Sequence, residues 1–196
     1  YEVAIVEKAG ELGGKAARLW RDIPATAPFD ELADSGVAAL IDAVQSEDKI
    51  SVFLNGTLTK TSGAPGCFEV EIATESGSTQ TETFGAVIMA SGYEPYDPIQ
   101  LPELGFGASA DVVDQLTLED LAREADGGPI KRPSDGKAVE SVVFVQCAGQ
   151  RSGKAGQLSY CSGHCCLTSF KQARYFNDTH PAVDTTILYT DLRTPG

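Results

Sequence analysis

The stretch VESVVFVQC, residues 139–147, decides the architecture of this chain because it joins a buried strand directly to a thiol. Its β-branched and aromatic residues predict a strand. A loop and the segment CSGHCC at 161–166 follow, opening a helical stretch that we expect to reach about residue 176. TTILYTDL, at 185–192, predicts a second strand. A strand, a crossover helix and another strand in this order indicate a parallel α/β arrangement.

Four thiols converge in this arrangement. Cys147 comes at the carboxyl end of the strand, where open α/β sheets bind their ligands. Cys161 and Cys165 share a helix face if both are helical, and Cys166 lies about 100° further round the same helix. The positive end of the helix dipole and the unpaired N–H groups of the first turn favour an anionic cluster. We therefore expect a cradle for a [4Fe–4S] cluster.

Three other interpretations of the cysteines remain open. They could be small buried apolar side chains, as free cysteines often are. They could form a catalytic dithiol, although bridging the adjacent Cys165 and Cys166 would strain the backbone and the disulfide. Zinc could replace iron and sulfide, with His164 as a fourth ligand. Cys67, alone at the start of a predicted strand, is expected in the core.

The first residues, YEVAIVEK at 1–8, predict a buried strand that ends in Glu7. In a dinucleotide-binding unit, the strand that ends in an acid is the second, about 20 residues after a Gly-rich turn. We therefore expect the first strand and its GxGxxG turn to be missing from this chain, and both ends to be cut. Glu7 is positioned to accept ribose hydroxyls, and Gly13 and Gly14 allow backbone to approach a ligand.

The segment between the two strand–helix regions predicts a small β-meander and a linker. ISVFLNG at 50–56 and CFEVEIA at 67–73 read as strands, and a helix capped by Asp30 is expected before them. AVIMA at 86–90 predicts another strand, and the small residues Ser91 and Gly92 then either approach a cofactor or form a tight turn. Residues 99–137 are expected to connect two domains, with one short helix capped by Thr117.

Composition limits the function classes. The 196 residues carry a net charge of −13, which argues against binding to nucleic acid or to an anionic membrane surface. No apolar run approaches the roughly 18 residues of a membrane span. The five cysteines are too crowded for the disulfide framework of a secreted domain, so a reducing, cytoplasmic setting is expected, with a peripheral place on a membrane complex left open.

Six segments together resemble one known family. They are VEKAGELGGKAARL (6–19), GAVIMASGYEPYDP (85–98), RPSDGK (132–137), FVQCAGQR (144–151), YCSGHCC (160–166) and YTDLRTPG (189–196). In this order they resemble the A subunit of heterodisulfide reductase and the related A subunit of quinone-interacting membrane-bound oxidoreductases. The cysteine spacing after RPSDGK is the most specific part of this resemblance. Many members carry a cysteine-rich ferredoxin-like insertion where this chain has the polar segment 74–83.

The resemblance implies an α/β, thioredoxin-reductase-like flavoprotein built from parts of two Rossmann-like domains. Residues 1–98 would form a partial FAD-binding domain, 99–137 a connecting segment, and 138–196 a partial second domain that carries the cysteines. The residues implied to bind FAD are Glu7, Lys8, Gly13, Gly14, Ser91 and Gly92. Those implied to ligate a [4Fe–4S] cluster are Cys147, Cys161, Cys165 and Cys166.

The implied activity is electron transfer within an oxidoreductase, although a fragment of this size is expected to be inactive alone. The expected partners are other redox subunits of a heterodisulfide-reductase-like complex, with a homodimer left open. Neither nucleic acid nor direct membrane insertion is expected. The alternative is a zinc-stapled or metal-free scaffold that docks redox subunits. The sequence assigns no catalytic residue.

Overall fold

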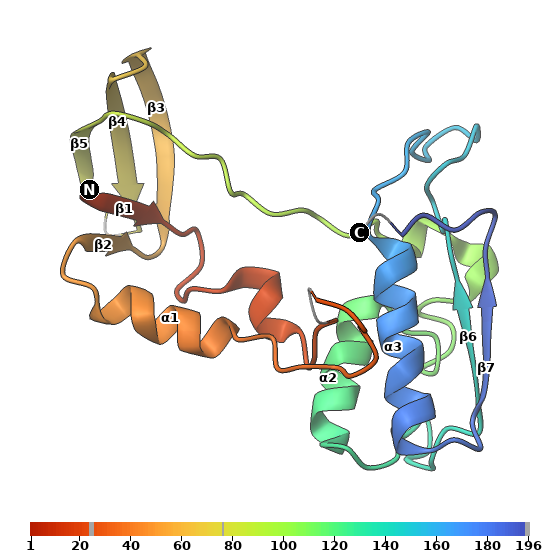
Figure 1. Ribbon diagram of the computed structural model, residues 1–196. Coiled ribbons are helices and arrows are strands. Elements are labelled where there is room, and N and C mark those ends of the chain that lie inside the picture. The colour runs from red at the N-terminus through yellow and green to blue at the C-terminus, as the bar shows by residue number, and fades with distance from the viewer. Residues whose placement is uncertain (24–25, 76, 195–196) are drawn as a thin grey trace. The chain divides into compact units, whose positions relative to one another are not determined.

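The computed structural model describes residues 1–23, 26–75 and 77–194, and shows a mixed α/β chain with parallel and antiparallel sheets (Figure 1). The strands are β1 (Val3–Val6), β2 (Ile50–Phe53), β3 (Gly56–Ala64), β4 (Cys67–Thr74), β5 (Thr79–Phe84), β6 (Ser141–Val145) and β7 (Asp184–Leu188). The α-helices are α1 (Val37–Ser46), α2 (Gln115–Ala125) and α3 (Cys165–Thr179). Short 3-10 helices are η1 (Gly14–Arg18), η2 (Pro98–Gln100) and η3 (Pro102–Leu104).

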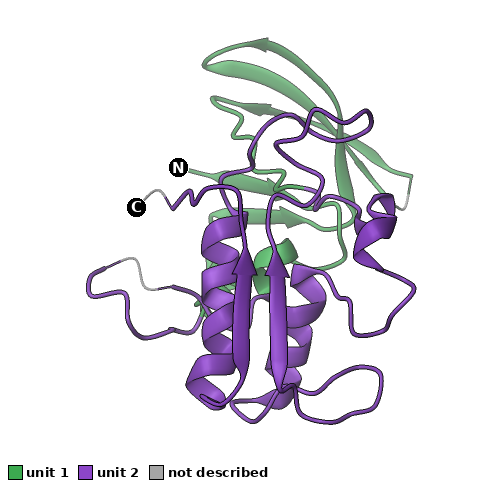
Figure 2. Ribbon diagram, turned by 90° about the vertical axis from the view of Figure 1, so that its right-hand side faces the viewer, with its two compact units in different colours: residues 1–17, 35–93 green, residues 18–34, 94–196 purple. Residues whose placement is uncertain are grey.

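The chain divides into two compact units (Figure 2). Unit 1 comprises Tyr1–Ala17 and Ser35–Tyr93, and unit 2 comprises Arg18–Asp34 and Glu94–Gly196. The division differs from the expected ranges in two respects. Residues 99–137 belong to unit 2 instead of standing apart as a connecting segment, because α2 packs against α3. Residues 18–34, which we call the strap, also belong to unit 2 although unit 1 surrounds them in sequence.

Unit 1 is a strand–helix–strand unit joined to a β-meander. β1 and β2 pair in parallel, with Val3 opposite Ile50 and Val6 opposite Phe53, and α1 lies between them in sequence. The pairing continues past β1, because the Glu7 N–H donates to the Phe53 carbonyl at 2.9 Å. The antiparallel sheet β3–β4–β5 confirms the predicted meander.

Several predictions of local structure in unit 1 were wrong. Helix α1 begins at Val37, and its N-terminal cap residue is Gly36, which has a left-handed φ of 68°. Asp30 is therefore not the cap. A strand that was not predicted, β3, lies in sequence between β2 and β4. Cys67 at the start of β4 is exposed and does not belong to the core.

AVIMA at 86–90 is not a strand in the structure. Ile88 is 88% exposed and Met89 is 79% exposed. Apolar sequence alone does not make a strand, because a strand needs a partner for its backbone hydrogen bonds. Within the described ranges 1–23, 26–75 and 77–194, none of the paired strands includes this segment.

Unit 2 is built on the parallel pair β6–β7, with Ser141 opposite Asp184 and Val145 opposite Leu188. Both helices of the unit lie on one side of these strands (Figure 1). The hydrophobic core between them consists of Leu118, Ala122, Ile130, Phe144, Ala173, Tyr175, Phe176 and Val183. The rings of Phe144 and Phe176 meet edge to face with centroids 6.3 Å apart, which joins β6 to α3.

The cap of α2 also differs from the prediction. The Asp114 side chain accepts the Thr117 N–H at 2.7 Å, so Asp114 is the cap and Thr117 lies in the first turn. No helix within the described residues combines the length and the apolar character that a membrane span requires. The last two residues of the motif at 189–196 lie outside the described residues.

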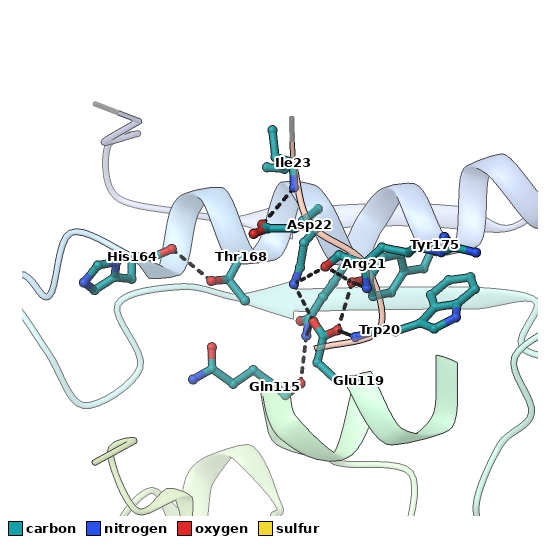
Figure 3. A network of polar contacts seen from close by, with 11 residues as sticks. Trp20, Arg21, Asp22, Ile23, Gln115, Glu119, His164, Thr168 and Tyr175 are labelled. Carbon is teal, nitrogen blue, oxygen red and sulfur yellow. Dashed lines mark hydrogen bonds and ion pairs between the residues drawn. The ribbon is translucent and has the colours of Figure 1, made fainter. Parts of the chain in front are cut away.

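A buried carboxylate joins three parts of unit 2 (Figure 3). Glu119 on α2 is 1% exposed, and its Oε1 lies 3.0 Å from the Lys171 ammonium of α3. Its Oε2 accepts hydrogen bonds from the Tyr175 hydroxyl at 2.8 Å and from the backbone N–H of Trp20 at 2.9 Å. Gln172 donates to Oε1 as well, at 2.9 Å. The carboxylate therefore satisfies donors from α3 and from the strap at once.

Lys171 and Tyr175 complete the network by reaching the strap themselves. The Lys171 ammonium donates to the Arg21 carbonyl at 2.9 Å, and the Tyr175 hydroxyl lies 3.2 Å from the same oxygen. Burial and the nearby Glu119 charge raise the pKa of Tyr175 well above its ordinary value, so the hydroxyl stays protonated and keeps donating. The ring of Trp20 packs edge-on against Tyr175 at 4.8 Å.

Substituting Glu119→Ala is expected to destabilise unit 2 by about 3–5 kcal/mol, because it leaves the Lys171 ammonium buried without its counter-charge. Urea unfolding followed by the fluorescence of Trp20, the chain's single tryptophan, measures this change. The control Asp178→Ala removes a more exposed ion pair within α3, with Arg174, and should cost less than about 0.5 kcal/mol. Equal losses in both variants would contradict the role assigned to the network.

Candidate metal centre

Cys147 lies two residues beyond the end of β6. The N–H of Gln146 still donates to the Leu188 carbonyl at 2.9 Å, so the strand pairing holds the residue immediately before the thiol. Cys147 then takes a φ of 60°, an uncommon conformation for a residue with a side chain. The N–H of Gln150 closes a turn onto the Cys147 carbonyl at 3.0 Å. Non-glycine residues in such conformations gather at functional sites.

The other three cysteines lie at the start of α3. Cys165 and Cys166 are the first two helical residues, behind His164 as the N-terminal cap residue. Cys161 precedes the helix and lies in the loop, so the condition under which Cys161 and Cys165 would share a helix face is not met. The chain turns at Gly163, with a φ of 77°, and the helix starts only after that turn.

Hydrogen-bond donors surround the sulfurs. Cys161 Sγ accepts the Gly163 N–H at 3.4 Å, and Cys166 Sγ accepts the Arg193 N–H at 3.4 Å. Cys166 Sγ also lies 3.2 Å from Oε1 of Gln146, the residue before Cys147. The strand end and the helix start are therefore neighbours in the structure.

The protonation of Cys165 argues against the catalytic dithiol. Burial has the largest effect and raises the pKa of the Cys165 thiol. Ser162 and the backbone of Cys147 lower this pKa, and the neighbouring Cys166 raises it. A thiol–disulfide oxidoreductase needs a lowered pKa at its attacking sulfur. All five cysteines of the chain are free thiols. The site is therefore better suited to hold a ligand than to exchange disulfides.

Gln146 contributes a polar group to this site that the sequence did not indicate. Its side chain is 8% exposed, and the Cys166 thiol donates to its Oε1 at 3.2 Å. Its Nε2 is buried and lacks a partner, the only such side-chain nitrogen or oxygen among the described residues. An unsatisfied buried donor costs about 1–3 kcal/mol. The unpartnered Gln146 Nε2 therefore indicates that a hydrogen-bond acceptor belongs next to it in the site.

The donors at this site are thiols. Thiolates are the soft ligands that iron–sulfur clusters take. Across the described parts of the chain, no three His, Cys, Asp or Glu side chains are placed to hold one metal ion. His164, the alternative zinc ligand, is exposed. The ligands of a four-iron cluster bind separate irons and need not meet at one point.

The side chain of Tyr96 packs against the cysteine loop, the segment between Cys147 and Cys161. A Cβ on Gly149 would lie 2.2 Å from the Tyr96 ring, so the ring packs directly on the backbone two residues after Cys147. The Tyr96 hydroxyl donates to the Gly156 carbonyl at 3.3 Å, further along the loop. Nothing in the sequence around Tyr96 indicates this long-range contact.

Ion pairs fasten the same loop to the segment after β7. Arg151 pairs with Asp191, which also pairs with Arg193 at 3.3 Å. Arg193 is the residue whose N–H reaches the Cys166 sulfur. The residues after β7 are therefore part of the site, a role that their sequence did not reveal.

The residues implied to bind FAD all lie in unit 1. Glu7 follows β1, and its Oε1 accepts the Ala9 N–H at 2.7 Å, which fixes the carboxylate at the strand end. Lys8 is exposed beside it. Gly13 has a packing role, because a Cβ there would lie 2.9 Å from Ile41 Cδ1 of α1. A Cβ on Gly14 would meet nothing within 4 Å, so its backbone is open to a ligand.

Ser91 and Gly92 lie in the irregular segment after β5, and both are exposed. Gly92 has a φ of 69° with open space around its α-carbon. The next residue, Tyr93, lies with its ring centroid 5.6 Å from the Lys15 ammonium, within the range of a cation–π contact. This contact brings the segment of Ser91 and Gly92 toward the Gly14 loop.

Known proteins with similar sequences are A subunits of one enzyme. The A subunit of the ferredoxin:CoB–CoM heterodisulfide reductase from Methanosarcina mazei is 38% identical over 114 residues, which cover 57% of this chain and 14% of the relative. The iron–sulfur A subunit of the CoB–CoM heterodisulfide reductase from Methanocaldococcus jannaschii is 39% identical over 114 residues, 57% of this chain and 17% of that protein. The chain is related to the heterodisulfide reductase A subunits. The resemblance drawn from the motifs is thus confirmed.

The heterodisulfide reductase relatives are far longer than the matched region, which spans only 14% and 17% of these two proteins. No protein-family model matches the chain. The L-proline dehydrogenase of P. horikoshii aligns with all of this chain and 32% of its own, with 11% identity and a TM-score of 0.44, a likeness that supports no conclusion.

Substituting Gly149→Ala in this heterodisulfide reductase relative is expected to lower the unfolding free energy of unit 2 by about 1–3 kcal/mol. The added methyl overlaps the Tyr96 ring at a backbone φ of 74°. Gly153→Ala in the same loop is the control, because its Cβ would meet nothing within 4 Å, and it should change stability by less than about 0.5 kcal/mol. Urea unfolding of both variants measures the difference, and a neutral Gly149→Ala would contradict the packing described.

Proposed function

We propose that this chain is an electron-transfer module of a heterodisulfide-reductase-like oxidoreductase complex and that it holds a [4Fe–4S] cluster. The proposed ligands are Cys147, Cys161, Cys165 and Cys166. The observation that carries the proposal is the contact between the strand end and the helix start, where Cys166 Sγ at the beginning of α3 lies 3.2 Å from Oε1 of Gln146, the residue before Cys147. The Methanocaldococcus relative is named an iron–sulfur subunit, which supports the proposal. When bound, such a cluster supplies one-electron chemistry whose potential depends on its surroundings.

The chain's own residues prepare this site for negative charge. Backbone N–H groups of Gly163 and Arg193 already donate to cysteine sulfurs. Cys166 is 3% exposed, so water has little access to its sulfur. Cys165 and Cys166 also occupy the first turn of α3, where the helix dipole stabilises anions. Together these backbone groups offset the charge of thiolate ligands.

We propose further that unit 1 contributes to an FAD site. The proposed contacts are Glu7, Lys8, Gly13, Gly14, Ser91 and Gly92. Glu7 would accept ribose hydroxyls, since its carboxylate is fixed at the end of β1 by the Ala9 N–H. The open backbone at Gly14 and Gly92 would allow close approach of the cofactor. A bound flavin would supply the two-electron chemistry of the complex.

The proposed partners are other redox subunits, because the relatives are themselves named as subunits. Iron ligation requires the thiols to remain reduced. We therefore propose a cytoplasmic location, either free or at the periphery of a membrane complex.

Protein purified anaerobically and supplied with iron and sulfide is expected to bind about four irons per chain and to lose most of them in Cys165→Ala. Cys67→Ala is the matched control, since this exposed cysteine lies in unit 1 and should leave the iron content unchanged. Iron, sulfide and zinc analysis with visible absorbance provides the measurement. Colourless protein without iron would refute the cluster, and bound zinc without visible absorbance would favour a scaffold that docks redox subunits.

Substituting Glu7→Gln is expected to weaken FAD binding about tenfold, because a ribose hydroxyl donates more strongly to a carboxylate than to an amide. The amide oxygen of glutamine can still accept the Ala9 N–H, so the local turn should persist. Glu11→Gln, on an exposed neighbour in the same loop, is the control for the loss of charge. Titration with FAD, followed by flavin fluorescence, compares the variants, and equal affinities would remove Glu7 from the proposed site.

A further inference from the structure

Gln146 occupies the junction between the strand and the helix that carry the cysteines. Its N–H pairs with the Leu188 carbonyl, so the residue extends the β6–β7 pairing. Its side chain turns into the protein, is 8% exposed, and lies with Oε1 3.2 Å from the Cys166 sulfur. Its Nε2, also buried, has no partner among the described residues. One end of the amide is thus used and the other is not.

Whether Gln146 Nε2 has a partner depends on whether Cys166 is a protonated thiol or a thiolate. A protonated thiol can donate, and it does so to the amide oxygen. A thiolate bound to iron has no proton and can only accept, so its natural partner is the amide nitrogen. A carboxamide can present either atom by turning through 180° about its last bond. Gln146 is therefore matched to both states of the same sulfur.

We propose that Gln146 donates an N–H···S hydrogen bond to the metal-bound Cys166 thiolate and thereby raises the reduction potential of the cluster. The inference rests on the cluster proposed above. Hydrogen bonds to ligand sulfurs withdraw negative charge from them and stabilise the reduced, more negative state. The Arg193 N–H already reaches the same sulfur at 3.4 Å, so Cys166 would have two donors, one from each of two separate segments.

Gln146 acts through Cys166 and is therefore a positioning and tuning residue. A packing role alone would be met by an apolar side chain of similar volume. Leucine has that volume and lacks the amide, so Gln146→Leu separates the two roles. Gln157→Leu, in the loop between Cys147 and Cys161, is the matched control, because the sequence has the same residue type there while the side-chain contact to the Cys166 sulfur comes from Gln146.

The test is a redox titration of anaerobically loaded protein, monitored by the electron paramagnetic resonance of the reduced cluster. In Gln146→Leu the equilibrium constant for reduction is expected to fall about tenfold, which for a one-electron couple is a shift of about 59 mV to lower potential. The iron content should stay at the wild-type value. Gln157→Leu should titrate as the wild type does.

The outcomes separate this inference from the proposal on which it rests. An unchanged potential in iron-loaded Gln146→Leu overturns the inference and leaves the cluster in place. Absence of iron from the wild type overturns both. If Gln146→Leu fails to load, Gln146→Met decides, because methionine has a similar length, carries no charge and has no N–H to donate. A lower potential in that variant supports the hydrogen bond, and a wild-type potential overturns it.

Discussion

The carboxylate of Glu119 is the constraint on which unit 2 depends. It lies at 1% exposure and receives donors from Lys171 and Tyr175 on α3 and from Trp20 on the strap. A buried charge is tolerated only when it is paired and fully hydrogen-bonded, so the three parts must come together in one arrangement. Because Cys165 and Cys166 begin the same helix, the network also fixes where the thiols lie. The proposed metal centre would thus be positioned by a polar core further along α3.

The cysteine loop needs a second set of restraints because it has no regular secondary structure. The Tyr96 ring rests on Gly149, and Arg151 binds Asp191. These contacts join the loop to segments that are distant in sequence. The loop can therefore hold Cys147 at a φ of 60° without the support of a strand or helix.

Periodicity predicted those elements whose formation depends on their own residues. Strands β1, β2, β4, β6 and β7 and helix α3 follow directly from their sequences. The failures have a common cause. AVIMA at 86–90 is apolar enough for a strand but lacks a pairing partner among the described strands, and Cys161 is separated from α3 by the turn at Gly163. The roles of Gln146 and Tyr96 were missed because each depends on a contact between residues far apart in sequence.

Side chains alternate between exposed and buried along β6 and through Gln146, the residue after it. Val143 and Val145 are 55% and 45% exposed, whereas Phe144 and Gln146 are buried, as the period of two requires. Position 146 therefore faces the interior, where an apolar residue would gain stability and an amide with one unsatisfied end loses it. Glutamine at that place is costly for the fold of the free protein. This cost is offset if Cys166 is a thiolate, because its sulfur then accepts a hydrogen bond from the Gln146 amide N–H and no donor is left without a partner.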